Sequence, residues 1–240
     1  MVSRVIPNSI KVVIRQLQRR RSDKKSGIQS QFAKLENPSL KKSFSSIISV
    51  TQPIHFNPLS SNKVENIKIA IKKIEPIVIQ PNQIFSFWEL VKKPSKKDGY
   101  KSGRNIIGDK LQEDIGGGLC QVSGIIYHLA LLSGMEIVER HNHTIDLYKE
   151  EERYTPIGTD ATVVFGYKDV RFKNSTSSAL SFSFEVGESQ FSSILLADKK
   201  LPVFRLRFIR EEFSDYRTVK TYRINSNNEE SYINLSRYKL

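Results

Sequence analysis

The chain has 240 residues, of which 38% are hydrophobic and 10% aromatic, enough for one large domain with a modest core. Its single cysteine excludes an internal disulfide framework and any cysteine-based zinc finger. The net charge of +13 is concentrated in residues 1–50, which hold 11 Lys and Arg against 2 acidic residues, so the basic character belongs to an N-terminal arm.

This basic arm, residues 1–50, is predicted to contain a short amphipathic helix. Ser9 can cap the helix, and one of its faces would carry Ile10, Val13, Ile14 and Leu17. Such a helix can lie on an anionic membrane surface or touch an acidic polymer; alternatively, it docks on its own domain through the four apolar residues. No nucleic-acid-binding pattern accompanies it, so nucleic acid is not an expected partner.

Two features of the sequence bear on location. Arg4 and Lys11 interrupt the apolar residues near the N-terminus before the apolar region of a secretory signal is complete. No run of about 18 apolar residues is present to span a membrane. We therefore expect a cytoplasmic or peripheral membrane protein, which would be extracytoplasmic only if an unrecognised route exports it.

Residues 51–215 are predicted to form an α+β domain, followed by a C-terminal strand or tail over 216–240. Apolar residues at helical spacing predict a helix from Lys63 that Pro76 ends. The predicted strands cover residues 77–79, 84–88, 136–140, 161–167, 170–173, 180–186, 193–197, 203–208 and 218–224. The short turns between the later strands indicate an antiparallel meander.

The centre of the predicted domain is the segment Gly116-Gly117-Gly118-Leu119-Cys120-Gln121-Val122-Ser123. Apolar residues continue at helical spacing behind it, and Gly134 stands where a helix would end. Cys120 would then lie in the first helical turn, where unpaired N–H groups and the helix dipole favour the reactive thiolate. The alternative is that Cys120 is a small buried hydrophobic residue.

The predicted fold class is therefore α+β, with a mixed, mainly antiparallel sheet wrapped around a central helix. That helix carries the glycine-rich cysteine motif at its N-terminus.

Three polar residues are candidates to act with Cys120, namely His141, His143 and Asp160. In an extended segment the two histidines would point to the same face. A Cys–His pair whose ring is oriented by a third group is the usual arrangement for acyl transfer, and Asp160 can be that group. The alternative is a metal site with all four residues as ligands. We favour acyl transfer without a metal or cofactor, because the glycine run offers N–H donors that a closed metal site does not need.

Arg140 and Arg171 are candidates to bind an anionic substrate, since a guanidinium can hold a carboxylate through two hydrogen bonds. Arg171 follows Asp169 in a predicted strand, so an internal salt bridge is an equal alternative for it.

The order of these motifs resembles the VanW family over about residues 63–200. The resemblance lies in Gln83-Ile84-Phe85-Ser86-Phe87-Trp88, Gly99-Tyr100, the glycine and cysteine motif, Glu139-Arg140-His141-Asn142-His143, Gly158-Thr159-Asp160-Ala161-Thr162-Val163 and Asp169-Val170-Arg171-Phe172. The Phe-Trp pair and the short chain are most similar to the stand-alone members found beside glycopeptide-resistance genes.

The resemblance implies a cysteine acyltransferase of the peptidoglycan L,D-transpeptidase type, with hydrolysis as in a carboxypeptidase as a variant. Cys120 would attack a diamino acid carbonyl in a tetrapeptide stem and release the terminal D-alanine. His143 would act as general base, Asp160 or a backbone carbonyl would orient it, and N–H groups around Gly118 and Cys120 would hold the oxyanion. The residues expected to bind substrate are Gly117, Gly118, Gln121, Ser123, Arg140, His141, Arg171, Ser86 and Trp88.

A second hypothesis keeps the partner, a peptidoglycan peptide stem or precursor, but removes the chemistry. In it the chain is a non-catalytic accessory protein that binds muropeptides or precursors and contributes to glycopeptide resistance. Cys120 would then be buried, or would not be paired with His143.

Overall fold

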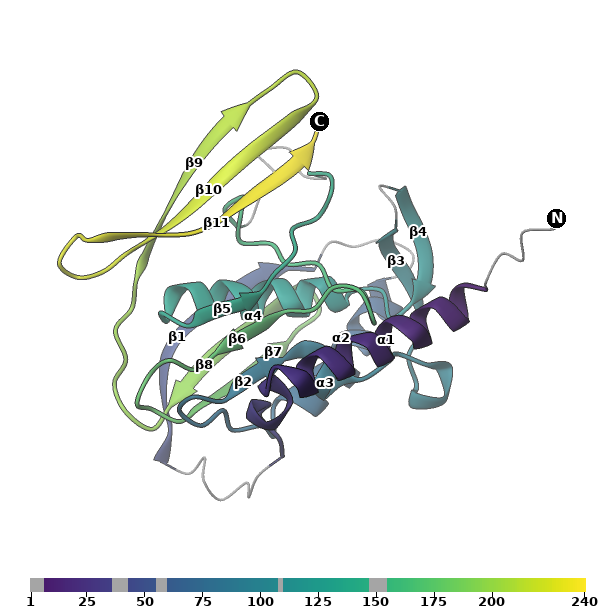
Figure 1. Ribbon diagram of the computed structural model, residues 1–240, viewed down its shortest axis with the longest axis horizontal. Helices are drawn as coiled ribbons and strands as arrows, with labels where there is room; N and C mark the ends of the chain where they lie inside the picture. Colours follow the sequence, from purple (N-terminus) through teal and green to yellow (C-terminus); the bar gives the residue numbers. More distant parts are fainter. Residues whose placement is uncertain (1–6, 36–42, 55–59, 108–109, 147–154) are drawn as a thin grey trace.

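The computed structural model describes residues 7–35, 43–54, 60–107, 110–146 and 155–240 (Figure 1). It is a mixed α+β structure whose sheets are antiparallel, which confirms the predicted fold class. The α-helices of the described part are α1 (Asn8–Lys25), α2 (Ser60–Ile74), α3 (Phe87–Val91) and α4 (Leu119–Leu132). Two short 3-10 helices are η1 (Ile28–Gln31) and η3 (Lys96–Asp98). None of the helices in these ranges combines the length and apolar character needed to cross a bilayer.

The described strands form four small sheets. The first contains, in order, β1 (Ser45–Pro53), β8 (Gln190–Ala197) and β7 (Leu180–Val186). The second contains β2 (Ile84–Ser86), β6 (Arg171–Lys173) and β5 (Glu136–Glu139). The third contains β11 (Glu230–Lys239), β10 (Tyr216–Ile224) and β9 (Arg205–Glu212), and the fourth pairs β3 (Ser102–Ile107) with β4 (Lys110–Ile115).

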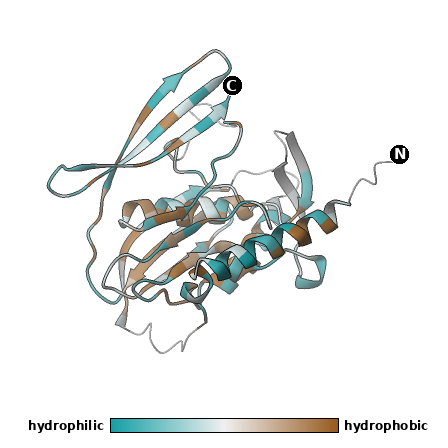
Figure 2. Ribbon diagram, in the orientation of Figure 1, coloured by the Kyte–Doolittle hydropathy of each residue, from teal (hydrophilic) through white to brown (hydrophobic). Residues whose placement is uncertain are grey.

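Helix α4 lies in the main hydrophobic core and contacts α2, β1, β5, β8 and β9. Val122, Ile125, Ile126 and Leu129, which follow the cysteine at helical spacing, are all 0% exposed. Figure 2 shows hydrophobic residues along this helix and along the strands beside it. Burial on all sides holds α4 in place, and its first turn therefore has a defined position.

Three predicted strands differ from the structure. The strand predicted over 77–79 is absent, and the structure has only isolated bridges at Ile77 and Ile79. The strand predicted over 84–88 ends at Ser86, whose hydroxyl accepts a hydrogen bond from the backbone N–H of Glu89 and so caps α3. This is the Ser-x-x-Glu pattern of a helix start. The strand predicted over 161–167 is absent: the structure has only an isolated bridge between Val164 and Lys168, closed by a turn that contains Gly166 at φ 84°.

The C-terminal sheet is continuous across the expected domain boundary at residue 215. Strands β9 and β10 pair on either side of this boundary, and β11 pairs with β10. The buried guanidinium of Arg223 on β10 donates hydrogen bonds to the carbonyls of Leu131 (2.8 Å) and Met135 (3.0 Å) at the end of α4. These bonds satisfy carbonyls that a helix end leaves unpaired, and they attach the C-terminal sheet to the central helix.

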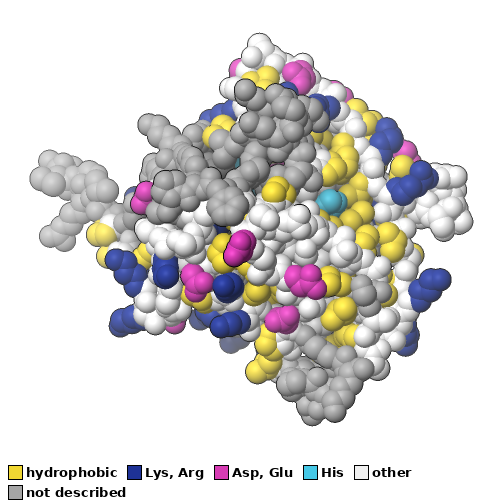
Figure 3. Space-filling view, turned by 180° about the vertical axis from the view of Figure 1, so that it is seen from behind, with side chains coloured by type: hydrophobic (Ala, Val, Ile, Leu, Met, Phe, Trp, Pro, Cys, Tyr) yellow, Lys and Arg dark blue, Asp and Glu magenta, His cyan; other side chains and the backbone are white. Residues whose placement is uncertain are grey.

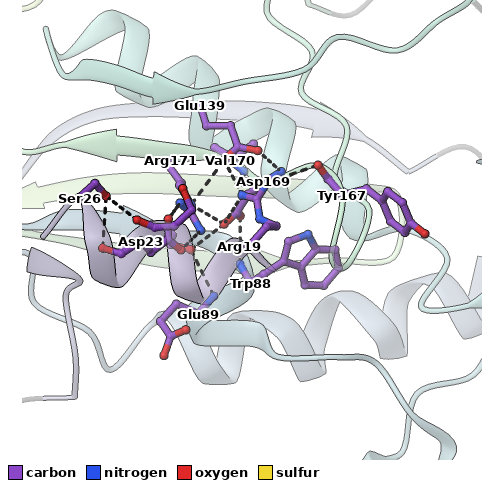
Figure 4. A network of polar contacts seen from close by, with 12 residues as sticks. Arg19, Asp23, Ser26, Trp88, Glu89, Glu139, Tyr167, Asp169, Val170 and Arg171 are labelled. Atoms are coloured by element: carbon purple, nitrogen blue, oxygen red, sulfur yellow. Dashed lines mark hydrogen bonds and ion pairs between the residues drawn. The ribbon is translucent and has the colours of Figure 1, made fainter. Parts of the chain in front are cut away.

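Helix α1 is longer than predicted and docks on the domain through polar side chains (Figure 4). Asp23 accepts two hydrogen bonds, 2.8 and 2.9 Å long, from the buried guanidinium of Arg171. Arg19 donates to the carboxylate of Glu139 and to the carbonyl of Tyr167. The predicted apolar face points away from the domain, with exposed fractions from 40% at Ile14 to 55% at Val13. Docking through the apolar residues is therefore wrong.

The described part of the opposite face of the molecule has a different character. There, acidic and basic side chains are interspersed (Figure 3). The excess of basic residues found in the N-terminal arm is thus not repeated on the described part of this face.

We predict that Asp23→Ala detaches α1. The substitution leaves the buried Arg171 guanidinium without its bidentate partner, and the loss of one member of a buried ion pair costs about 3 kcal/mol. Limited trypsin digestion should then cut faster after Arg20 and Arg21, and urea unfolding should show the lower stability. Ser22→Ala, at an exposed neighbouring position, is the control. Equal cleavage rates in both variants would contradict the docking role of Asp23.

Candidate active site

The glycine run gives α4 its unusual start. Gly118 has φ of 100°, a left-handed conformation that favours glycine. A Cβ at this position would lie 2.7 Å from Cγ of Lys63, so the close approach of α2 also requires glycine. The side chain of Asn66 on α2 donates to the carbonyl of Gly117 at 2.9 Å. Helix α2 therefore holds the turn that places Cys120 in the first turn of α4.

Cys120 is partly buried against the core, and its sulfur faces the 161–163 segment. Its Sγ atom lies 3.5 Å from Oγ1 of Thr162 and 3.9 Å from the carbonyl oxygen of Val163. The backbone N–H groups of Gly117, Gly118 and Cys120 have no hydrogen-bond acceptor among the described residues. The thiol thus lies in the first turn of a helix whose first N–H groups are unpaired among the described residues.

His143 is oriented by Asp160. Its ring Nδ1 lies 2.8 Å from Oδ2 of Asp160, and the same oxygen accepts the backbone N–H of His143 at 2.8 Å. This pairing leaves Nε2 of the ring free of Asp160, and His143 lies near enough to the Cys120 thiol for the two groups to shift each other's pKa. The structure therefore brings together the three residues predicted to be catalytic.

The second oxygen of Asp160 is held from two sides. Nη2 of Arg140 donates to Oδ1 at 2.9 Å, and the hydroxyl of Tyr238 donates to the same atom in a short hydrogen bond. Arg140 also donates to the Asp160 carbonyl and to the hydroxyl of Ser236, and its side chain is only 4% exposed. Arg140 therefore positions the carboxylate and does not present a free guanidinium to a substrate.

These contacts shift the pKa of each group. Burial acts to raise the pKa of the Cys120 thiol, but the hydrogen bond and charge of His143 bring that pKa below its usual value. Burial acts to lower the pKa of His143, but Asp160 and Cys120 raise it to about 10. Burial acts to raise the pKa of Asp160, but Arg140 and His143 hold it far below its usual range. At neutral pH the arrangement favours a thiolate–imidazolium pair beside a carboxylate.

Two other predicted substrate-binding residues follow Cys120 on α4. The Gln121 side chain donates from Nε2 to the carbonyl of Pro53 at 3.0 Å, while its buried Oε1 has no partner in the described structure. The Ser123 hydroxyl is buried and donates to the carbonyl of Ala161 at 2.7 Å. Ser123 thus ties α4 to the 161–163 segment, whereas Gln121 ties α4 to the end of β1.

Ser86, Trp88 and Arg171 gather instead around the buried carboxylate of Asp169 (Figure 4). The hydroxyl of Ser86 donates to it at 2.7 Å, the backbone N–H of Trp88 at 3.1 Å, and Nε of Arg171 at 2.9 Å. Arg171 is therefore engaged by Asp169 and Asp23, and the internal salt bridge is the alternative that the structure shows.

His141 and His143 have different partners. Strand β5 ends at Glu139, so the alternation that would place both rings on one face does not continue to them. Nε2 of His141 lies 3.0 Å from the carboxylate of Glu139. No cluster of three or more potential ligands is arranged for a metal ion within the described ranges, and the structure does not support the four-ligand alternative.

The sequence analysis did not identify Tyr238, Ser236 and Thr162 as parts of this site. The first two lie on β11, which was expected only as a strand or tail. Tyr238 is 78 residues from Asp160 in the chain, and no local motif links the two. Thr162 follows Asp160 in a recognised motif, but its contact with the sulfur depends on how α4 packs.

We predict that His143→Ala raises the pKa of Cys120 whereas His141→Ala leaves it unchanged. Removal of the imidazolium destabilises the thiolate, so the alkylation rate at low pH should fall and its midpoint should move toward about 8.5. Iodoacetamide labelling across a pH series, read by mass spectrometry, measures this midpoint. A similar midpoint in His143→Ala and the unmodified protein would contradict the pairing.

Comparison with known proteins identifies the family of this chain. The family model described as VanW like protein matches residues 62–195, which include Cys120, His143 and Asp160. The chain is 29% identical to the vancomycin B-type resistance protein VanW of Enterococcus faecalis over 169 residues, or 68% of this chain and 62% of that protein. It is 38% identical to the uncharacterized protein YoaR of Bacillus subtilis over 120 residues, or 50% of this chain and 38% of that protein.

The chain thus spans less than two thirds of the length of either relative. No solved structure matches it. Because the family model covers more than half of the sequence, the protein belongs to the VanW-like family.

Proposed function

We propose that the protein is a cysteine acyltransferase that acts on peptidoglycan peptide stems, as an L,D-transpeptidase or a carboxypeptidase. The observation that carries this proposal is the Cys120–His143–Asp160 arrangement, in which a thiol of lowered pKa at a helix N-terminus lies beside a histidine that a carboxylate orients. Such a combination is the usual machinery of acyl transfer. The relative named as a vancomycin B-type resistance protein supports a role in cell-wall modification associated with glycopeptide resistance.

In the first half of the reaction the Cys120 thiolate attacks the carbonyl carbon of the diamino acid residue that precedes the terminal D-alanine. A carbon–sulfur bond forms, and the carbonyl oxygen takes the negative charge. The unpaired N–H groups of Gly118 and Cys120 are the donors proposed to stabilise this oxyanion. Protonated His143 then gives its proton to the leaving nitrogen, the peptide bond breaks, and D-alanine departs.

In the second half the thioester is attacked by an amine of a neighbouring stem, or by water in the hydrolytic variant. Neutral His143 accepts the proton of the attacking group, and the carbon–sulfur bond breaks to restore the thiolate. Asp160 keeps the ring oriented and stabilises its positive charge in both halves. Arg140 and Tyr238 act through Asp160 as positioning residues.

We predict that the purified protein releases D-alanine from tetrapeptide muropeptides that carry a diamino acid at the third position. Cys120→Ala should abolish release and also the thioester adduct at this residue. Asp160→Asn should slow release by about 100- to 10,000-fold, because the ring loses the group that orients it and stabilises its charge. Mass spectrometry detects both the released amino acid and the adduct.

Asp215→Asn, at an exposed position, is the matched control and should keep full activity. Tight binding of the muropeptide without any release or adduct, equal in Cys120→Ala and the unmodified protein, would reject the enzyme. That result would favour the non-catalytic binding protein.

A further inference from the structure

Helix α1 exposes an apolar stripe whose residues follow at helical spacing. Its members are Ile10, Val13, Ile14 and Leu17, with exposed fractions of 49%, 55%, 40% and 49%. Surface helices normally turn such a stripe toward the core. Here the stripe faces outward along the first half of the helix, and no described segment of the chain covers it.

The orientation of α1 is set by ion pairs on its other side. Arg19 and Asp23, one turn apart, bind Glu139 and Arg171 on the domain. The side chains of these two residues are only 24% and 12% exposed. Rotation of the helix to bury the stripe would break both ion pairs and leave the buried Arg171 guanidinium without its bidentate partner Asp23. The apolar face is therefore held outward.

The same outer surface is strongly basic. Counted from Leu17, Arg21 and Lys24 lie four and seven residues further on, so they continue the line of the stripe. Beside them lie the exposed residues Lys11 and Lys25, whereas Arg15 and Arg20 lie on the side of the helix that faces the domain. The only acidic residue of α1, Asp23, faces the domain. The outward surface thus combines apolar residues in its first half with uncompensated positive charge in its second half.

This combination restricts the partner. A second copy of the chain placed on the same surface would bring positive charges together, which opposes pairing. A soluble polyanion would neutralise the charges but would not bury the apolar stripe. A bilayer with anionic headgroups meets both requirements. The apolar residues can be buried at the boundary of the acyl chains, and the headgroups can neutralise the Lys and Arg side chains.

We propose that α1 is a built-in anchor that lies in the plane of an anionic membrane surface. The first half inserts Ile10, Val13, Ile14 and Leu17 among the lipids, and the second half places its Lys and Arg among the headgroups. The ion pairs of Arg19 and Asp23 then fix how the domain stands on the membrane. This inference does not depend on the chemistry of Cys120.

Vesicle flotation of the full chain tests the anchor. The protein should bind vesicles of equal amounts of phosphatidylcholine and phosphatidylglycerol, and it should bind far less to phosphatidylcholine alone or at high salt. The double substitution Ile14→Asp with Leu17→Asp should weaken binding by about 100-fold or more, because apolar burial is replaced by negative charge. Arg21→Glu with Lys24→Glu should weaken it by at least about tenfold.

The matched control is Val203→Asp with Leu235→Asp, which changes two apolar residues of similar exposure, 50% and 51%, outside α1. This control should bind like the unmodified protein, and circular dichroism should show that all three double variants fold. Binding unaffected by the α1 substitutions, or equal binding to neutral and anionic vesicles, would overturn the proposal. So would a dimer in lipid-free solution that the stripe substitutions convert to a monomer, because the stripe would then join two copies.

Discussion

The carboxylate of Asp160 is the group on which the arrangement of the site depends. It accepts hydrogen bonds from His143, Arg140 and Tyr238, which come from two segments remote from it in the chain. A partly buried negative charge is stable only where such donors replace the water that it loses. The same donors determine the ring orientation of His143 and, through that ring, the ionisation of the Cys120 thiol. The charge of the Asp160 carboxylate therefore influences the ionisation of the Cys120 thiol through His143, without direct contact between the two groups.

Helix α4 fixes the position of the Cys120 sulfur relative to the Asp160 carboxylate. Its apolar residues are buried on all sides, and the glycine turn before it is held by α2. The C-terminal sheet attaches to the other end of α4 through Arg223 and supplies Tyr238 and Ser236 to the site. Because these strands pair across residue 215, the sheet is part of the site and not an appendage. A rigid helix between two attachments keeps the Cys120 thiol near His143.

Helix α1 follows a different principle of packing. Its contact with the domain includes ion pairs around the Asp169 cluster, while its apolar stripe of Ile10, Val13, Ile14 and Leu17 faces outward. Hydrophobic burial normally dominates the docking of a helix onto a domain. Here buried ion pairs fix the helix with its apolar stripe exposed, which supports the proposed contact of this stripe with a membrane. The segment from Glu139 to His143 joins the two networks, because Glu139 binds Arg19 while His143 serves the thiol. The proposed membrane anchor and the proposed catalytic site are thus attached to the same short segment of the chain.

The sequence alone determined the features that depend on local geometry. Glycines followed by apolar residues at helical spacing place Cys120 in a first helical turn, since backbone conformation and periodicity are encoded within a few residues. Only the tertiary structure decided which charged groups meet. It assigned His143 and not His141 to the thiol, made Arg140 a support for Asp160, and brought in Tyr238 from 78 residues away. It also turned the apolar face of α1 outward. The partner of a long charged side chain depends on segments that fold beside it, and local spacing carries no information about them.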